Sequence, residues 1–207
     1  MSFIPTKIAA VAVVAALAVS GGVYAQSALN TDPAAVEAGA YTLETSHARV
    51  VFATSHMGFS TWYGDFSGAT GTLTLDPKDP AASKLEVSIP AASVTTTNAK
   101  LDAELKSADW FDAATYPTIT FKSTKVTPTG PGAAKVEGDL TFHGVTKPVT
   151  LDARFKASGT NPLSKAYTVG FEVTGQLKRS DFGVKTYVPL IGDEVSLMIS
   201  APFEKAK

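Results

Sequence analysis

From residue 41 onward, apolar and polar residues alternate with a period of two, the pattern of β-strands that bury one face. In the run 49–56, for example, Val50, Phe52, Thr54 and His56 share one face of the predicted strand. About eight or nine such runs follow one another, separated by short turns rich in Gly, Pro, Asn and Asp. An antiparallel sheet of this kind buries its apolar face by closing on itself, which also removes its exposed edges. We therefore predict an all-β fold, an eight-stranded antiparallel barrel.

The segment 98–106 breaks the period of two. Asn98 can cap a helix, and Leu101 and Leu105 are one helical turn apart. We predict a short helix here, lying over one end or side of the barrel. The connection that contains it, residues 91–116, is long for a compact β domain, and such connections often form lids or entrances.

The first residues have the features of an export signal. Lys7 gives a positive start, residues 8–19 form an unbroken apolar run, and Val23-Tyr24-Ala25 ends the segment in the pattern that signal peptidase requires. A membrane anchor is the alternative, but a spanning helix needs about 20 apolar residues and this run is shorter. We therefore predict export to the periplasm and three parts of the chain: a cleaved signal peptide at 1–25, a flexible leader at 26–40 and a barrel domain at 41–205.

Composition excludes several classes of function. The 207 residues carry a net charge of −1, from 18 basic and 19 acidic residues, which does not suggest a nucleic-acid partner. The sequence contains no cysteine, so disulfides, thiol nucleophiles and cysteine-based metal sites are ruled out. It also contains no nucleophile elbow, phosphate-binding loop or dinucleotide fingerprint. No motif of a familiar catalytic class therefore points to an enzyme.

Four stretches of the sequence contain motifs of a known family. The opening stretch YTLETSHARVVFATSHMGFSTWYGDFSGATGTLTLD combines an aromatic residue, an acid and a histidine with a V-x-F strand and a later His-Met pair. The stretches WFDAATYPTITF, VEGDLTFHGVTKPVTL and RSDFG follow. Together, from Tyr41 to about Phe203, they resemble the bacterial YceI family. The resemblance implies a periplasmic, lipocalin-like barrel that binds long isoprenoid or fatty amphiphiles in an apolar interior, often as a dimer.

The histidines and one arginine are the polar candidates for a site. His47 and His56 flank one strand and lie about 30 Å apart along it, so they cannot share a metal ion unless a bulge or turn intervenes. No zinc-type spacing is present, and we expect no metal or cofactor. His56 is either a hydrogen-bonded residue at the barrel end or a contact for a ligand headgroup. Arg179 either pairs with Asp181 and fixes a loop to the rim, or faces an anionic or quinone headgroup.

Aromatic residues concentrate in the Gly-rich strand region, the long connection and the late loop. As a set they are typical of the mouth and wall of a lipid channel, although core packing accounts for any single one. Small residues in the strands, such as Gly64, Ala69 and Gly138, leave room for a narrow apolar channel inside the barrel. The predicted ligand-binding residues are Phe52, His56, Phe59, Trp62, Phe66, Trp110, Phe111, Tyr116, Arg179, Phe182 and Tyr187.

The leading hypothesis is periplasmic binding, transport or storage of a long isoprenoid, an isoprenoid quinone or another fatty amphiphile. On this hypothesis the protein uses no metal or cofactor, allows a homodimer, binds no nucleic acid and does not insert stably into a membrane. One alternative is an enzyme that acts on such a lipid through His47 or His56 and a carboxylate. Another is a barrel embedded in a membrane, which the helix, the long connection and the Lys-Ala-Lys end do not favour.

Overall fold

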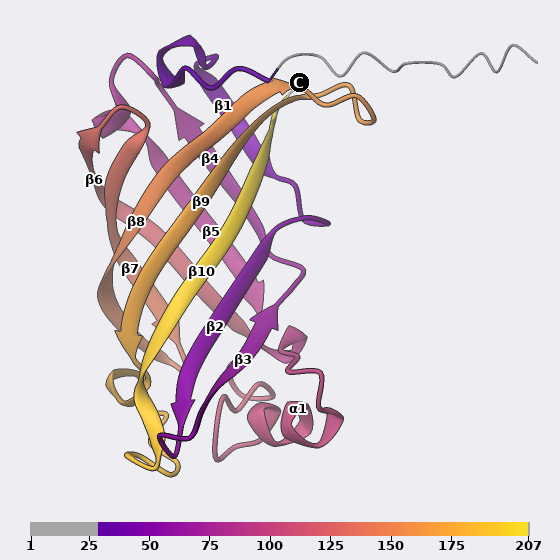
Figure 1. Cartoon of the computed structure of the whole chain (residues 1–207), viewed down its shortest axis with the longest axis vertical. Helices are drawn as coiled ribbons and strands as arrows, with labels where there is room; N and C mark the ends of the chain where they lie inside the picture. Colours follow the sequence, from indigo (N-terminus) through magenta and orange to yellow (C-terminus); the bar gives the residue numbers. More distant parts are fainter. Residues whose placement is uncertain (1–28, 207) are drawn as a thin grey trace, which may run out of the picture.

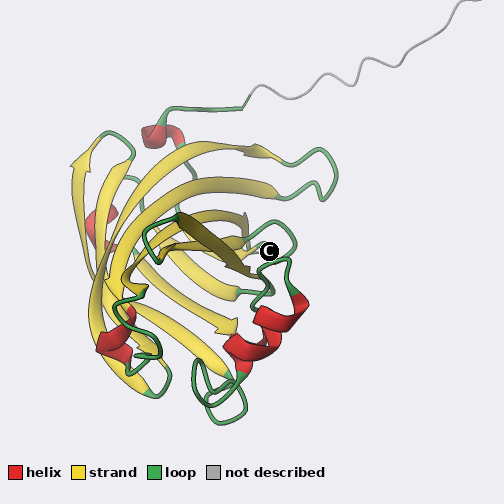
Figure 2. Ribbon diagram, turned by 60° about the horizontal axis from the view of Figure 1, so that its bottom comes forward, coloured by secondary structure: helices red, strands yellow, loops and turns green. Residues whose placement is uncertain are grey.

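The structure is a computed structural model that describes residues 29–206. Its dominant feature is one antiparallel sheet rolled into a barrel, with a short helix against one end (Figures 1 and 2). The helix α1 spans Ala99–Lys106. The strands are β1 (Gly39–Leu43), β2 (Arg49–His56), β3 (Ser60–Phe66), β4 (Thr70–Leu75), β5 (Lys84–Pro90), β6 (Thr118–Gly130), β7 (Ala133–Phe142), β8 (Val145–Thr160), β9 (Tyr167–Lys178) and β10 (Ile191–Lys205).

The sheet closes because β10 pairs with three strands. Along one side it pairs with β9, and along the other with β2 through residues 191–200 and with β1 through residues 203–205. β1 and β2 therefore share one position of the barrel, and β3 and β4, which pair with them, share the next. Six further strands complete the ring in the order β5-β6-β7-β8-β9-β10. The predicted eight-stranded barrel is confirmed, and two of its positions are each built from two short strands.

Helix α1 lies beside β3 at one end of the barrel (Figure 1). β3 pairs with β2 only, whereas β4 pairs with both β1 and β5, so the outer edge of β3 has no strand partner. Residues 91–117 leave β5 here, and Asp65 and Thr95 exchange backbone hydrogen bonds of 2.8 and 2.9 Å that tie this connection to β3. The side chain of Asn98 accepts hydrogen bonds from the first amides of the helix, and Leu105 is buried against the barrel. The predicted helix and its cap are therefore present, and they cover this end of the barrel.

The apolar face of the sheet points into the barrel and the polar face points outward. Lysines and carboxylates on neighbouring strands pair across the outer surface, as in Lys122–Glu86 at 2.7 Å and Lys156–Glu172 at 2.7 Å. This is the reverse of the arrangement that a barrel with a lipid-facing outer wall needs. Separately, none of the helices within residues 29–206 is long and apolar enough to span a membrane.

The segment before β1 packs against the end of the barrel that is distant from α1. Asn30 and Ser158 exchange two backbone hydrogen bonds of 2.8 Å, a short 3₁₀ turn follows at Pro33–Ala35, and Val36 is buried. Glu37 then forms an ion pair with Lys205 at the end of β10. Residues 29–38, which the sequence analysis places in the leader, therefore contact the barrel, because Pro33 and Val36 bury apolar surface on it. The predicted signal peptide and residues 26–28 lie outside the described residues.

Candidate functional site

The barrel encloses a cavity of about 1090 Å³, here called the lumen. All ten strands contribute side chains to its wall, and most of these side chains are apolar. Asp32, Pro33 and Ala34 border the lumen at one end, and Leu101, Glu104 and Leu105 of α1 border it at the other. Sites for drug-sized molecules usually occupy about 300–1,000 Å³. The lumen is therefore slightly larger than the usual range for such a site, and it runs along the barrel.

Glycines in the wall keep this lumen open by an indirect route. A Cβ atom on Gly64 would lie 2.3 Å from Cζ of Phe52 on the neighbouring strand, so the Phe52 ring lies flat over the glycine. Phe121 covers Gly138 in the same way, and Leu151 covers Gly175. The expectation that Gly64 and Gly138 themselves leave open space is therefore wrong. They let large side chains lie against the wall, so that the centre of the barrel stays empty.

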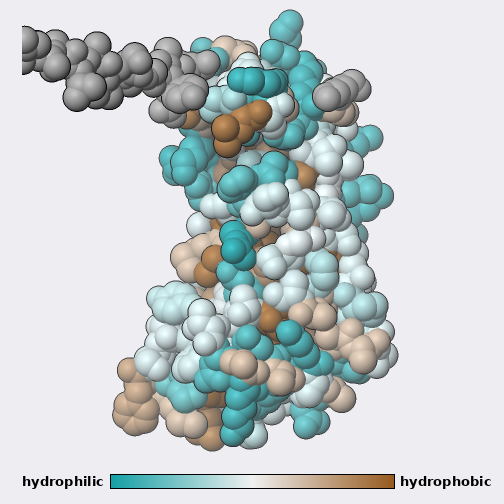
Figure 3. Space-filling model, turned by 90° about the vertical axis from the view of Figure 1, so that its right-hand side faces the viewer, coloured by the Kyte–Doolittle hydropathy of each residue, from teal (hydrophilic) through white to brown (hydrophobic). Residues whose placement is uncertain are grey.

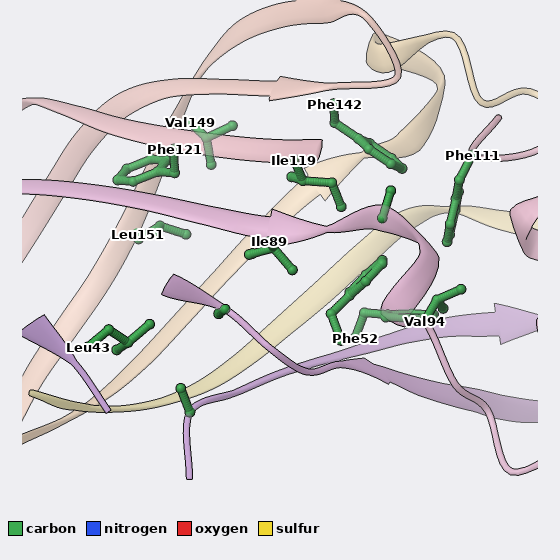
Figure 4. Close-up of a cluster of buried hydrophobic side chains, with 14 of the residues drawn as sticks. Leu43, Phe52, Ile89, Val94, Phe111, Ile119, Phe121, Phe142, Val149 and Leu151 are labelled. Carbon is green, nitrogen blue, oxygen red and sulfur yellow. The ribbon is translucent and has the colours of Figure 1, made fainter. Parts of the chain in front are cut away.

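A row of four phenylalanines crosses the lumen wall near the α1 end, and Figure 4 labels three of them, Phe52, Phe111 and Phe142. Ring centroids are 5.6 Å apart for Phe52 and Phe66, 5.8 Å for Phe66 and Phe111, and 5.2 Å for Phe111 and Phe142. These residues come from β2, β3, the long connection and β7, so the row joins segments that are distant in sequence. Their apolar contacts hold the connection, and with it α1, against the barrel.

His56 and Trp62 face the lumen at the same end. Their rings are 5.9 Å apart, and both residues border the cavity. Nε1 of Trp62 is buried and has no hydrogen-bond partner, which is an uncommon condition for an indole N–H. Thr54, one step deeper on β2, instead donates its hydroxyl to the carbonyls of Gly192 and Glu194. His56 and Trp62 therefore place polar ring atoms in a mostly apolar wall.

Arg179 is buried and its donors are used by the protein itself. Its guanidinium donates to the carbonyl oxygens of Gly192, Val184, Thr186 and Ile191 at 2.9–3.1 Å. Burial lowers the pKa of Arg179, which the nearby Asp193 opposes in part. The guanidinium also lies 5.3 Å from the ring centre of Trp110. These contacts fix the loop between β9 and β10 to the end of the barrel.

The carboxylate that supports this loop is Asp193, and the expected pairing of Arg179 with Asp181 is wrong. Ser180 donates both its amide and its hydroxyl to Asp193, at 2.9 and 2.7 Å. Burial alone would raise the pKa of Asp193, but these hydrogen bonds and the charge of Arg179 outweigh it and lower the pKa. Asp181 is instead exposed, because the 3₁₀ turn Arg179–Phe182 points its side chain to solvent.

The other two histidines lie outside the lumen. His47 is mostly exposed in the turn between β1 and β2, where Nδ1 is 2.5 Å from the Glu44 carboxylate. His143 hydrogen-bonds the backbone oxygen of Phe182 at 3.0 Å and so helps to fix the β9–β10 loop. Within residues 29–206, no group of three or more histidine and carboxylate side chains could hold a metal ion.

Comparison with known proteins matches the barrel to one family. The model of the YceI-like domain matches residues 41–203, which run from β1 to β10. Protein YceI of Escherichia coli O157:H7 is 44% identical over 157 residues, which cover 76% of this chain and 81% of that protein. The chain belongs to the YceI-like family.

Solved structures of YceI-like and related proteins have the same barrel. The crystal structure of BcnA from Burkholderia cenocepacia superposes with a TM-score of 0.70 at 26% identity, covering 77% of this chain and 98% of that one. A polyisoprenoid-binding domain from Saccharophagus degradans, implicated in plant cell wall breakdown, superposes with a TM-score of 0.58 at 16% identity. It covers 82% of this chain and all of that one, and at this identity it shows the fold alone.

The YceI-like barrel brings most of the predicted site residues to its lumen. The predicted residues that border the cavity are Phe52, His56, Trp62, Phe66, Trp110, Phe111, Arg179 and Tyr187. Whether they contact a ligand stays a prediction. Sequence analysis did not single out many wall residues, including Leu73, Phe121, Phe155 and Phe171. The same alternation that defines the strands would have found them, because each lies on the apolar face.

Three predicted site residues do not border the lumen. Phe59 is 92% exposed at the tip of the β2–β3 hairpin. Tyr116 packs over Gly144 and against the ring of His143, at 5.1 Å, on the outside of the wall. Phe182 belongs to the β9–β10 loop, and its buried ring packs behind Phe142, on the side of the wall away from the lumen. All three belong to loop segments that we expected at the mouth of the barrel, but the turns that hold them direct their side chains away from the lumen.

Proposed function

We propose that the lumen binds a long-chain amphiphile, such as an isoprenoid, an isoprenoid quinone or a fatty compound. The observation that carries this proposal is a continuous, almost wholly apolar cavity of about 1090 Å³ inside one barrel. An empty apolar space of this size is costly for a protein unless a ligand fills it. The Saccharophagus degradans domain with the same fold is described as polyisoprenoid-binding, which agrees with this choice of ligand.

The hydrocarbon chain lies along the barrel and the headgroup lies at the α1 end. Apolar residues line the deeper part of the lumen, whereas the unpartnered indole N–H of Trp62 and the ring of His56 lie near α1. Burial of each methylene contributes about 0.8 kcal/mol, from which ordering costs must be subtracted. Affinity therefore comes from the hydrocarbon chain, and the headgroup contacts add selectivity.

Binding explains the polar groups better than catalysis on the same lipid does. The His47–Glu44 pair has the histidine and carboxylate that the enzyme hypothesis requires, but it lies on the outside of the barrel. His56 borders the lumen, and in the described part of the chain no ion pair joins it to a carboxylate. Export to the periplasm, where the protein would carry or store its lipid, remains a prediction from residues 1–25.

A titration with prenyl alcohols of increasing length tests this function. The lipid-free protein should bind each longer member more tightly until the lumen is filled, and a change of headgroup at constant chain length should have a smaller effect. Tryptophan fluorescence reports binding, because Trp62 and Trp110 both border the lumen. Equal affinity for short and long prenyl chains would show that the lumen is not the binding site.

A further inference from the structure

Four apolar side chains project from two loops at the α1 end of the barrel. Met57 and Phe59 belong to the β2–β3 hairpin, and Tyr187 and Leu190 belong to the loop before β10. Their exposed fractions are 52, 92, 60 and 62%. Met57 donates its amide to the carbonyl of Leu190 at 2.8 Å, so the two loops are joined. We call these four residues the apolar rim. Figure 3 shows apolar residues at this lower end of the molecule.

The hairpin holds Phe59 away from the protein. Met57 and Gly58 have φ angles of 53° and 72°, and the Phe59 amide donates to the His56 carbonyl at 3.1 Å. These are the features of a tight β-turn with Met57 and Gly58 at its centre, in a connection of three residues, which leaves little freedom for the tip. Exposure of a large aromatic side chain on such a fixed tip has a free-energy cost and contributes nothing to the core. The rim is therefore suited to contact with another apolar phase.

The rim is continuous with the lumen. Met57, Tyr187 and Leu190 border the cavity as well as the solvent, so an apolar path leads from the outside of the molecule to the interior. The two loops, residues 57–59 and 179–190, carry two exposed charged side chains, Lys185 beside the rim and Asp181 in the 3₁₀ turn. These two charges balance, so contact with a bilayer depends on the apolar side chains, and Lys185 is the charge that attracts an anionic headgroup. An aromatic and aliphatic edge with a basic residue is typical of a surface that enters the interfacial region of a bilayer.

We propose that the apolar rim docks on a lipid bilayer, so that a lipid passes between the bilayer and the lumen without crossing water. This inference rests on the proposed function, because it assigns the route by which the ligand enters. Phe59 enters the bilayer surface, while Met57, Tyr187 and Leu190 extend the apolar path from the bilayer to the lumen.

Phe59→Asp tests the docking, with Leu163→Asp as the matched control. Both residues are at least 90% exposed in tight connections, but Leu163 lies in the β8–β9 connection at the opposite end of the barrel. Neither borders the lumen, so neither change should abolish lipid binding, and all three purified proteins should contain lipid. Each protein is sedimented with vesicles of phosphatidylethanolamine and a minority of phosphatidylglycerol. Transfer of its bound lipid to the same vesicles is then timed.

The unchanged protein and Leu163→Asp should bind the vesicles equally, and Phe59→Asp should bind roughly tenfold or more weakly and transfer lipid more slowly. Equal binding and transfer by Phe59→Asp would overturn the proposal. So would a native dimer that Phe59→Asp separates while vesicle binding is unaffected, because the rim would then face a second copy. In either case, lipid that co-purifies with all three proteins leaves the proposed function intact, whereas its absence from all three contradicts that function.

Discussion

Replacement of Gly64 by alanine should push a phenylalanine ring into the lumen. The new methyl group would lie 2.3 Å from Cζ and 2.7 Å from Cε1 of Phe52, well inside van der Waals contact. Phe52 must therefore rotate away from the wall, toward the cavity that it borders. Overpacking of this kind costs about 1–3 kcal/mol, and removal of a glycine from a strand returns about 0.5–1 kcal/mol. The middles of these two ranges give a net loss in the free energy of unfolding of about 1 kcal/mol.

Thermal unfolding of the lipid-free protein measures this loss. For a domain of this size, a loss of about 1 kcal/mol lowers Tm by roughly 2–4 °C. Gly170→Ala is the control, because the nearest atom to its new Cβ is a carbonyl oxygen at 3.7 Å, which is an ordinary contact. Gly64→Ala should also weaken binding of the longest prenyl chains more than that of short ones. If Gly64→Ala equals Gly170→Ala in both Tm and long-chain affinity, Phe52 does not lie over Gly64 and the account of how the lumen stays open is wrong.

Three further substitutions test the polar groups around the barrel. Burial raises the pKa of Tyr41 from 10.0 to about 12, with smaller contributions from Tyr167 and Glu37, so the folded protein favours the neutral phenol. That stabilisation is complete below about pH 10 and is lost as the pH rises through about 12. Tyr41→Phe should therefore reduce the loss of stability between these pH values, and an unchanged denaturation profile would contradict this. Arg179→Met should lower the free energy of unfolding by roughly 3 kcal/mol or more in urea, because it leaves buried carbonyl groups unpaired; a loss below about 1 kcal/mol would refute the assignment of its hydrogen bonds. Trp62→Phe should change stability by less than about 1 kcal/mol, since the indole N–H has no partner. It should reduce the preference for a prenyl alcohol over the matching hydrocarbon, and an unchanged preference would exclude Trp62 from the headgroup contact.

The barrel could be predicted because alternation reports directly which face of a strand is buried. The run from Val50 to His56 shows this, since all four residues of its apolar face border the lumen. The sequence did not predict that two positions of the barrel are each built from two short strands. This arrangement arises because β10 pairs first with β2 and then with β1. That pairing joins residues that are more than 130 positions apart, which no local pattern reports.

The loops show where sequence reasoning fails and why. Phe59 lies in the aromatic-rich segment that we assigned to the mouth of the barrel. The Met57-Gly58 turn reverses the chain and directs the Phe59 side chain outward. The donor fork of Arg179 suits a headgroup equally well, and only the fold shows that four backbone carbonyls already accept its hydrogen bonds. The leader gave no periodic signal, although Pro33 and Val36 bury apolar surface at the barrel end. Only the partners of the leader are distant in sequence; for Phe59 and Arg179 the decisive feature is the local backbone geometry of a loop, which the pattern of residue types does not report.

The central claim is that the lumen holds a long-chain amphiphile. Native mass spectrometry of the protein purified from bacteria without detergent tests it most directly. We predict a folded protein that carries an additional mass, which on dissociation and fragmentation is identified as a lipid with a long prenyl or acyl chain. A protein that is fully folded, free of any bound lipid and still empty after incubation with a total lipid extract would contradict the account.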